Sequence, residues 1–375
     1  MDEQEIARRQ WVATLHPQTT VWEITLACNM RCIHCGSSAE PLRKRKDELT
    51  TEEALDVVRQ LKEIGTERIV FSGGEPFLRK DWEELAQEAA RLDIIPSFIS
   101  NGFLVNEKIA DRINGLKKER THIGLSIDGN EKVHDYIRQT KGSFKRVTRA
   151  LEILQEKGIH HSVVTQVNRL NFGLLPEIRD HIFKRGIYCW QIQLASPWGR
   201  LAENRKLLLT PKEYLKLVEF IVEQRKIFGE LVIGADDIGY YTELEAKIRP
   251  QGEWQGCHAG LRVLGLTSNG GVTGCLSLQQ PQFIEGNIRK RRLADIWFDP
   301  GLFAYNRNFK EEYMEGFCKE CPHHMKCRGG CKNTAFSFCG SLYDNDYCIF
   351  KVMLGKVKPR KLKIPKQAGP CSYHP

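Results

Sequence analysis

The sequence lacks a long hydrophobic run. No apolar stretch approaches the roughly 20 residues that a membrane-spanning helix needs. The polar N-terminus, MDEQEIARRQ, is not followed by the apolar segment of a secretory signal peptide. We therefore expect a cytoplasmic protein that does not contact a membrane. The 375 residues, 41% hydrophobic and 27% charged, argue against overall disorder, and they suffice for one domain of about 200 residues and a smaller one.

Acidic residues are missing from the end of the chain. Residues 351–366 contain seven basic residues and no acidic one, within a chain of net charge +9. Basic tails can bind nucleic acid. No aromatic residues are interleaved here, however, which favours a solvated tail or one that contacts a peptide.

Cysteine, in contrast, is abundant, with thirteen residues. In a secreted protein this number would suggest disulfides. Because the cytoplasm is reducing, metal ligation is the better interpretation.

Short apolar runs alternate with amphipathic segments between residues 20 and 230. The runs are rich in Val, Ile and aromatic residues, and we predict strands at 21–26, 67–72, 96–100, 122–128, 161–167 and 189–195. The segments between them have helical spacing, and capping boxes start two of them, at Thr50 with Glu53 and at Thr210 with Glu213. Six β–α repeats predict an α/β fold with a parallel sheet, either doubly wound or curved toward a barrel. In both folds the chemistry lies at the carboxyl ends of the strands.

After about residue 230 the alternation fades, and the chain becomes rich in Cys, Gly and Asn. Such a segment buries little apolar surface, so we expect it to need metal for its stability. The predicted organisation is an N-terminal segment 1–19, an α/β domain 20–230, a bridging region 231–256, a Cys-rich domain 257–350 and an extended basic tail 351–375.

The segment TLACNMRCIHCG directly follows the first predicted strand and places Cys28, Cys32 and Cys35 in one loop. A closed structural zinc site has four ligands, whereas three thiolates on a [4Fe–4S] cluster leave one iron free to bind another molecule. Zinc binding and simple burial of the thiols are the alternatives. The loop resembles the CxxxCxxC signature of the radical S-adenosylmethionine (SAM) superfamily. That resemblance implies a partial (β/α)6 TIM-like barrel.

The resemblance also implies a cofactor and a chemistry. In that family the open iron chelates SAM, and one electron from the cluster breaks the sulfonium bond. The resulting 5′-deoxyadenosyl radical abstracts hydrogen from the substrate. The cofactor performs the difficult step, while the protein binds, orients and excludes water.

Further residues match the family's SAM-binding positions. Gly73, Gly74 and Glu75 end the second predicted strand, where the family's GGEP motif meets the methionine amino group; a plain turn is the alternative. Arg138 matches an arginine that pairs with the SAM carboxylate, with a surface ion pair as the alternative. The other implied contacts are Ser100 and Asn101 after the third strand, Ser126 near the ribose, and His34 and Leu194 against the adenine.

Seven cysteines form a second pattern towards the C-terminus. C-x2-C pairs place two thiolates on one turn, and zinc ribbons use similar pairs, so zinc is the alternative metal. The pattern resembles the SPASM domain, an auxiliary-cluster extension of many radical SAM enzymes. The resemblance implies two auxiliary [4Fe–4S] clusters, one on Cys318, Cys321, Cys327 and Cys348, the other on Cys257, Cys275 and Cys331.

The second of these clusters has only three implied cysteines. Some SPASM proteins have a further cysteine close to the first, but none lies between Cys257 and Cys275. We expect the fourth iron to be open to water or substrate, with Cys339 as the alternative ligand. Cys189 is expected to be a buried small hydrophobe, and Cys371 is unassigned.

SPASM proteins most often modify peptides or proteins, so the resemblance implies a ribosomally made peptide substrate. Only 20 residues precede the first predicted strand, which favours a separate leader-binding protein. An external donor such as flavodoxin or ferredoxin would supply electrons. The alternatives are a small-molecule or tetrapyrrole substrate, as in haem-pathway members, sulfatase maturation, and non-enzymatic electron transfer. Leu276 stands where sulfatase maturases carry a catalytic Asp, and Asp236 and Asp237 are interpreted as surface acids rather than as a base.

Overall fold

The computed structural model describes residues 3–41, 43–116, 119–250 and 252–357. Within these residues, ten strands form one sheet, in the spatial order β10 (Gly286–Asn287), β9 (Gly271–Thr273), β8 (Val263–Leu266), β1 (Thr19–Thr25), β2 (Arg68–Gly73), β3 (Ile95–Ser100), β4 (His122–Ser126), β5 (His161–Val167), β6 (Cys189–Leu194) and β7 (Val232–Gly234). The strands from β8 to β7 in this order are parallel to their neighbours, whereas β9 and β10 are antiparallel.

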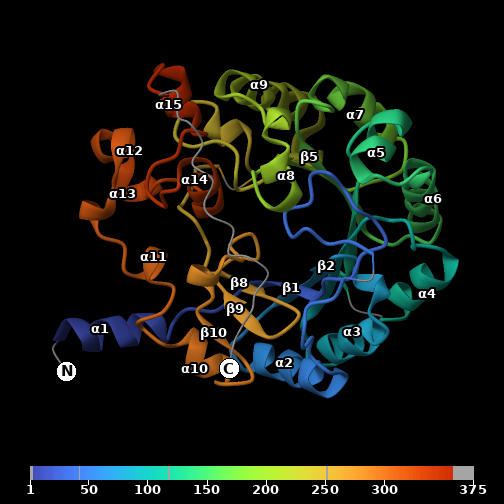
Figure 1. Ribbon diagram of the computed structural model, residues 1–375, viewed down its shortest axis with the longest axis horizontal. Coiled ribbons are helices and arrows are strands. Elements are labelled where there is room, and N and C mark those ends of the chain that lie inside the picture. The colour runs from blue at the N-terminus through green and yellow to red at the C-terminus, as the bar shows by residue number, and fades with distance from the viewer. Residues whose placement is uncertain (1–2, 42, 117–118, 251, 358–375) are drawn as a thin grey trace.

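Helices line the outside of the curved sheet (Figure 1). They are α2 (Thr51–Glu63), α3 (Trp82–Arg91), α4 (Glu107–Gly115), α5 (Glu131–Arg138), α6 (Ser143–Glu156), α7 (Leu175–Phe183) and α9 (Pro211–Phe228). The short helix α8 (Gly199–Glu203) lies instead beside the loop that follows β1. The sheet is open, because its edge strands are β10 and β7. The fold is therefore a partial α/β barrel, and the six strands predicted from the sequence are confirmed as β1 to β6.

Local sequence signals explain where the long helices begin. Thr50 Oγ1 accepts the Glu53 N–H at 3.3 Å, and the Glu53 carboxylate accepts the Thr50 N–H at 2.8 Å. Thr210 and Glu213 repeat this predicted capping box at the start of α9. The apolar faces of these helices pack on the sheet, where aromatic residues such as Phe71 and Phe98 are fully buried.

Two parallel strands were not predicted. β7 has three residues and β8 has four, so neither is long enough to give an alternation signal. β8 pairs with β1 in parallel register, from Thr19 opposite Val263 to Trp22 opposite Leu266. Part of the Cys-rich segment therefore belongs to the main sheet.

The rest of the Cys-rich segment consists of short helices and turns. The helices are α10 (Leu293–Trp297), α11 (Ala304–Arg307), α12 (Gly316–Glu320), α13 (His324–Cys327), α14 (Lys332–Cys339) and α15 (Ile349–Met353). A small apolar cluster of Tyr240, Tyr241 and Trp254 packs against four of the cysteines. Figure 1 shows this part beside the β8–β10 edge of the sheet and next to α9.

The structure corrects the start of the predicted basic tail. Lys351 lies in α15 with 2% of its side chain exposed. Its Nζ donates to Asp344 at 2.7 Å and to Asp346 at 2.6 Å. The two carboxylates compensate its burial, so Lys351 belongs to the folded part. Residues 358–375, most of the predicted tail, lie outside the described residues, as do Met1 and Asp2 at the N-terminus.

In the described part of the chain, no helix is long and apolar enough to cross a membrane. The N-terminal helix α1 (Glu3–Val12) is joined to the C-terminal part by Arg8, whose Nε donates to the Pro300 carbonyl at 2.9 Å.

Candidate active site

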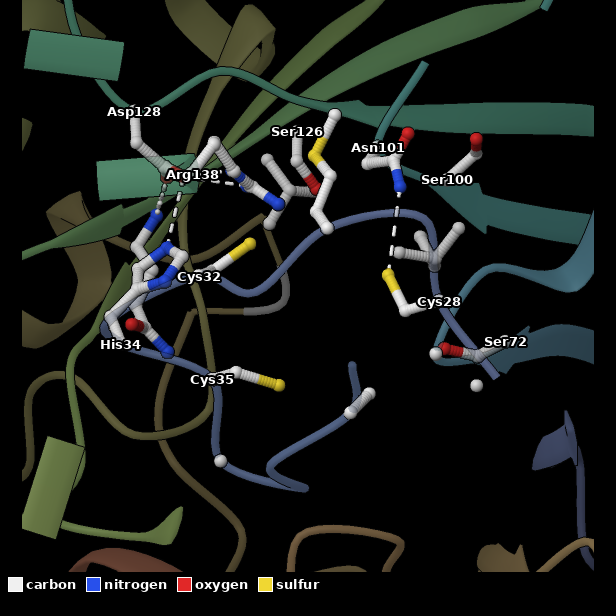
Figure 2. A pocket seen from close by; sticks show the side chains of 18 of the residues that line it. Cys28, Cys32, His34, Cys35, Ser72, Ser100, Asn101, Ser126, Asp128 and Arg138 are labelled. Atoms are coloured by element: carbon white, nitrogen blue, oxygen red, sulfur yellow. Dashed lines mark hydrogen bonds and ion pairs between the residues drawn. The ribbon is translucent and has the colours of Figure 1, made fainter. Parts of the chain in front are cut away.

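The loop after β1 carries the three N-terminal cysteines, and their thiols point toward one cavity (Figure 2). Backbone hydrogen bonds fix the loop: Ile33 donates to Ile137 at 2.9 Å, and Cys35 donates to Cys32 at 3.4 Å. Burial raises the pKa of Cys28 to about 12 and also raises the pKa of Cys32. A cluster bound here must therefore displace protons from these thiols.

Arg200 holds the same loop from the other side. Its Nε donates to the Cys32 carbonyl at 2.6 Å, its Nη2 donates to the Ala39 carbonyl at 2.6 Å, and its backbone N–H donates to the Cys35 carbonyl at 3.1 Å. No sequence motif indicates this role, because Arg200 is 168 residues from Cys32.

The cavity has a volume of about 240 Å³ and lies at the carboxyl ends of the strands. Its walls come from the cysteine loop and from the ends of β2 to β6. They are formed by Cys28, Met30, Cys32, His34, Cys35, Gly36, Ala39, Ser72, Gly73, Gly74, Ile99, Ser100, Asn101, Ser126, Asp128, Arg138, Val164, Gln166 and Gln193. The structure thus brings together most of the residues that the SAM-binding resemblance implies.

Gly73 and Gly74 allow β2 to approach the cysteine loop closely. The Gly74 N–H donates to the Thr25 carbonyl at 2.8 Å. A Cβ on Gly74 would lie 2.2 Å from the Ala27 carbonyl oxygen, and Gly73 has a φ of +151°. Only glycine fits these positions, which places the backbone of both residues in the cavity wall.

Glu75 is fully buried and is not part of the cavity wall. Its carboxylate accepts hydrogen bonds from Ser100 Oγ at 2.8 Å and from the Asn101 N–H at 2.9 Å. Burial raises the pKa of Glu75 to about 7, and the hydrogen bonds oppose that rise. Glu75 therefore positions the turn after β3, and Asn101 Nδ2 in turn donates to Asn29 Oδ1 at 2.7 Å.

Asp128 holds two other residues of the cavity wall, Arg138 and His34, in place. Its Oδ2 accepts from Arg138 Nε at 2.8 Å and lies 3.0 Å from His34 Nε2 (Figure 2). Its Oδ1 accepts the Gln166 N–H at 3.0 Å. Burial acts to lower the pKa of Arg138, but Asp128 and the thiol of Cys32 raise it above its ordinary value. Arg138 therefore stays cationic in the cavity wall.

Two adenine contacts were predicted, and the structure places them differently. His34 lines the cavity, and its ring is held by Asp128. Leu194 is buried and lies outside the cavity wall, whereas its neighbour Gln193 is part of it. Successive side chains of β6 point to opposite faces of the sheet, so only one of the two faces the cavity.

Four of the C-terminal cysteines line one small cavity of about 20 Å³. They are Cys318, Cys321, Cys327 and Cys348, the set that the SPASM resemblance implies for one cluster. Burial raises the pKa of Cys318 and Cys348 to about 12 each. Aromatic side chains, among them Tyr241 and Phe350, cover this cavity.

The other three cysteines of this part also lie near one another. Burial, and then Cys257, raise the pKa of Cys275 to about 11. Burial, Cys257, Asp237 and Cys275 raise the pKa of Cys331, in that order of effect. Among the described residues, no three His, Cys, Asp or Glu side chains are placed to hold one metal ion between them.

Two of the remaining cysteines, Cys339 and Cys189, have different surroundings. Cys339 packs against the main core, and its Sγ accepts the Asp346 N–H at 3.4 Å. Cys189 is buried in β6, where burial raises its pKa to about 11. Cys371 lies outside the described residues.

The interpretation of Asp236 and Asp237 as surface acids is wrong for Asp237. The Asp236 side chain is 60% exposed. The turn after β7 instead brings the Asp237 carboxylate under the end of β6, where Oδ2 accepts the Leu194 N–H at 3.1 Å and Oδ1 is buried. Burial raises the pKa of Asp237 to about 7.

Comparisons with known proteins agree with this geometry. A radical SAM superfamily model matches residues 22–172, and a SPASM model, an iron–sulfur cluster-binding domain, matches residues 257–322. An AdoMet-dependent heme synthase of Oleidesulfovibrio alaskensis is 31% identical over 335 residues, which is 85% of this chain and 84% of that protein. The chain belongs to the radical SAM superfamily. It is an enzyme with a C-terminal SPASM domain.

Other radical SAM proteins are similar over comparable lengths. The mycofactocin maturase MftC of Mycobacterium ulcerans is 29% identical over 324 residues, 85% of this chain and 84% of that protein. Streptococcus suis SuiB bound to S-adenosylmethionine has a TM-score of 0.71 at 17% identity, over 91% of this chain and 79% of SuiB. At that identity the likeness shows the fold alone.

Sequence reasoning missed Asp128 and Arg200 in this radical SAM site. Asp128 does carry a signal, because it is a carboxylate directly after a strand and precedes Arg138 by ten residues. Pairing of that kind depends on the path of the chain between the two residues. Arg200 carries no comparable signal.

Proposed function

We propose that this enzyme holds a [4Fe–4S] cluster on Cys28, Cys32 and Cys35 and cleaves SAM reductively, and that the resulting radical abstracts hydrogen from a ribosomally made peptide. The observation that carries the SAM-cleaving part is the convergence of three thiols, a glycine pair and a buried arginine on one cavity. When bound, the cluster and SAM supply the 5′-deoxyadenosyl radical.

The chain's own residues bind and orient SAM. Arg138 would pair with the carboxylate of SAM, because its guanidinium is anchored by Asp128 and still lines the cavity. The exposed backbone of Gly73 and Gly74 would receive the ammonium group. Ser126 and Asn101 would hydrogen-bond the ribose, and Ser100 and Glu75 would position Asn101.

His34 is the adenine neighbour that the cavity favours. Leu194 remains a candidate for the same role, but it would reach the adenine only past Gln193.

We further propose two auxiliary [4Fe–4S] clusters. One would bind to Cys318, Cys321, Cys327 and Cys348, which line one small cavity. The other would bind to Cys257, Cys275 and Cys331, because the thiol of Cys257 is close enough to raise the pKa of both Cys275 and Cys331. Thiols and clusters persist in a reducing compartment, so we place the enzyme in the cytoplasm, with flavodoxin or ferredoxin as its electron donor.

The peptide substrate is supported by the similarity to mycofactocin maturases from several mycobacteria, each 29% identical over 85% of this chain. A separate leader-binding protein would present that peptide. Sulfatase maturation is disfavoured, because Leu276 follows Cys275 where that class has an Asp.

A tetrapyrrole is the second candidate substrate. AdoMet-dependent heme synthases are 26–31% identical to this chain over 85–89% of its length, and an Fe-coproporphyrin III synthase is 28% identical. The overall similarity of the chain to these proteins is comparable to its similarity to the maturases.

One experiment separates the two candidates. The enzyme is co-expressed with each short peptide encoded beside its gene, and the peptides are analysed by mass spectrometry. A peptide mass change that disappears in the Cys32→Ala variant supports the peptide substrate. If the peptides stay unmodified, while an added iron porphyrin changes mass and stimulates formation of 5′-deoxyadenosine, the tetrapyrrole is the substrate.

A further inference from the structure

One of the two carboxylate oxygens of Asp237 is buried without a hydrogen-bond partner among the described residues. Asp237 follows β7, and its Oδ2 accepts the Leu194 N–H at 3.1 Å. Its Oδ1 is inaccessible to solvent and has no hydrogen-bond partner among the described residues. A buried carboxylate oxygen without a partner is costly, and such a group calls for a ligand that is absent from the protein chain itself.

Hydrogen bonds hold the Asp236–Asp237 segment near the set of three cysteines Cys257, Cys275 and Cys331. The Tyr240 hydroxyl donates to the Asp236 carbonyl at 2.7 Å and accepts the Cys331 N–H at 3.1 Å. Tyr240 therefore joins this segment to the start of α14, where Cys331 is the N-cap residue.

The same segment also lies near the residue that follows Cys257, the first cysteine of this set. The Asp236 carboxylate lies 4.0 Å from Nδ1 of His258, the residue that follows Cys257. The residue before Asp237 is thus near His258 and is joined through Tyr240 to Cys331.

We propose that Asp237 Oδ1 is the fourth protein ligand of the auxiliary cluster held by Cys257, Cys275 and Cys331. This inference rests on the proposed auxiliary cluster. Each of the four irons of a cubane needs a terminal ligand, and the three cysteines supply three of them. Cys339, the other candidate, is engaged by the Asp346 N–H and packs on the main core. Carboxylate oxygen is a harder ligand than thiolate, so this iron would exchange its ligand more readily than the other three.

The ligand can be tested on full-length protein that lacks only the N-terminal cluster. Cys28, Cys32 and Cys35 are replaced by Ala, and the protein is reconstituted anaerobically, so that auxiliary clusters alone give the signal. We compare this background with added Asp237→Ala, Asp237→Cys, Cys339→Ala or Asp236→Asn. Iron is counted, and the dithionite-reduced clusters are titrated with ¹³C-labelled cyanide while their EPR and hyperfine spectra are recorded.

We expect cyanide to bind the Asp237→Ala protein at concentrations at least about tenfold lower than the background protein requires, and not to bind the Asp237→Cys protein. Asp236→Asn and Cys339→Ala should retain the background's iron and spectrum. Asp236→Asn is the matched control, because it changes the neighbouring carboxylate.

Equal cyanide binding by the background and the Asp237→Ala protein would overturn the assignment. Loss of about four irons in Cys339→Ala would also overturn it, in favour of Cys339. If the Asp237→Ala protein fails to fold, the Asp237→Cys protein provides the test. An EPR spectrum and a cyanide response unchanged from those of the background protein would then contradict ligation of the cluster by Asp237. If the background binds no iron, the auxiliary clusters themselves are refuted, and the ligand with them.

Discussion

Arg138 is the residue on which SAM affinity should depend most. Asp128 holds its guanidinium at 2.8 Å, and both residues line the cavity. The Arg138 side chain is therefore fixed before SAM binds. As a result, Arg138 loses little side-chain entropy when it pairs with the carboxylate of SAM.

We predict that Arg138→Ala weakens SAM binding by roughly tenfold to a hundredfold, because a charge-assisted hydrogen bond contributes about 1.5–3 kcal/mol. The measurement is the SAM concentration dependence of 5′-deoxyadenosine formation, with the iron content determined in parallel. Arg149→Ala, which removes an exposed arginine of α6, is the control and should leave SAM binding unchanged. Unaltered SAM binding in Arg138→Ala would show that Arg138 does not contact the carboxylate.

At the residue scale, site residues that belong to a sequence motif could be identified from the sequence. Residues whose role depends on contacts between distant parts of the chain could not. The cysteines, the glycine pair and Arg138 were found through motifs, and the cavity includes the N-terminal cysteines, both glycines and Arg138. Asp128 and Arg200 act through contacts that only the folded chain creates. The adenine contact was assigned to Leu194, whereas its neighbour Gln193 lines the cavity. The sequence of a strand does not reveal which of two successive side chains points to a given face of the sheet.

Among the elements, the close approach of β2 to the cysteine loop is the most sensitive feature. The Gly74 N–H donates to Thr25, and the Glu75 N–H donates to Ala27, each at 2.8 Å. No side chain fits between these backbones.

We predict that Gly74→Ala loses the N-terminal cluster and retains the auxiliary ones, which is a loss of about a third of the iron. The added Cβ would lie 2.2 Å from the Ala27 carbonyl oxygen and must displace the loop that carries Cys28. Iron analysis and SAM cleavage measure the effect. Gly115→Ala in α4 is the control, because a Cβ there meets nothing within 4 Å. Full iron content with normal SAM cleavage in Gly74→Ala would contradict this account of the glycine pair.

Helix α14 carries a second unusual feature, a buried lysine directly after Cys331. Lys332 Nζ donates to the Leu342 carbonyl at 2.9 Å and lies 4.0 Å from the centre of the Tyr343 ring. Burial lowers the pKa of Lys332 to about 8, while the thiols of Cys257 and Cys327 act in the opposite direction. Its charge thus acts on cysteines of both proposed auxiliary clusters.

We predict that Lys332→Met lowers the midpoint potential of at least one auxiliary cluster by some tens of millivolts, because a nearby cation stabilises the reduced state. An EPR-monitored redox titration measures the potentials, and Lys332→Arg, which keeps the charge, should show a smaller shift. Iron content confirms that both clusters are present in each variant. Potentials equal to those of the unaltered protein in Lys332→Met would disprove the electrostatic role.

On the scale of the whole molecule, the barrel and the auxiliary part are joined by a partly buried polar network. Arg45 Nε donates to Glu23 Oε1 at 2.5 Å, and Ser268 Oγ donates to the same oxygen at 3.0 Å. Glu48 accepts the Leu26 N–H at 2.8 Å, two residues before Cys28, and its Oε1 lies 3.1 Å from Ser268 Oγ. The loop of the N-terminal cysteines is thus tied to the turn after β8.

This joining explains what the sequence could predict of the fold. Strands β1 to β6 are long enough to show an apolar pattern between helices, so their order and parallel direction were predictable. β7 and β8 contain only Val-Ile-Gly and Val-Leu-Gly-Leu, and they take their place from the neighbouring strand. The buried state of Lys351 likewise depends on Asp344 and Asp346, which the tail's composition does not reveal.

The central claim is that the triplet of Cys28, Cys32 and Cys35 holds the cluster that cleaves SAM. The most direct test is to incubate anaerobically reconstituted, dithionite-reduced protein with SAM and to quantify 5′-deoxyadenosine and methionine by mass spectrometry. We predict both products, about twelve irons per chain, and a Cys28→Ala/Cys32→Ala/Cys35→Ala variant that keeps about two thirds of the iron but forms no 5′-deoxyadenosine. Zinc as the main metal, or 5′-deoxyadenosine formed equally well by the triple variant, would contradict the account.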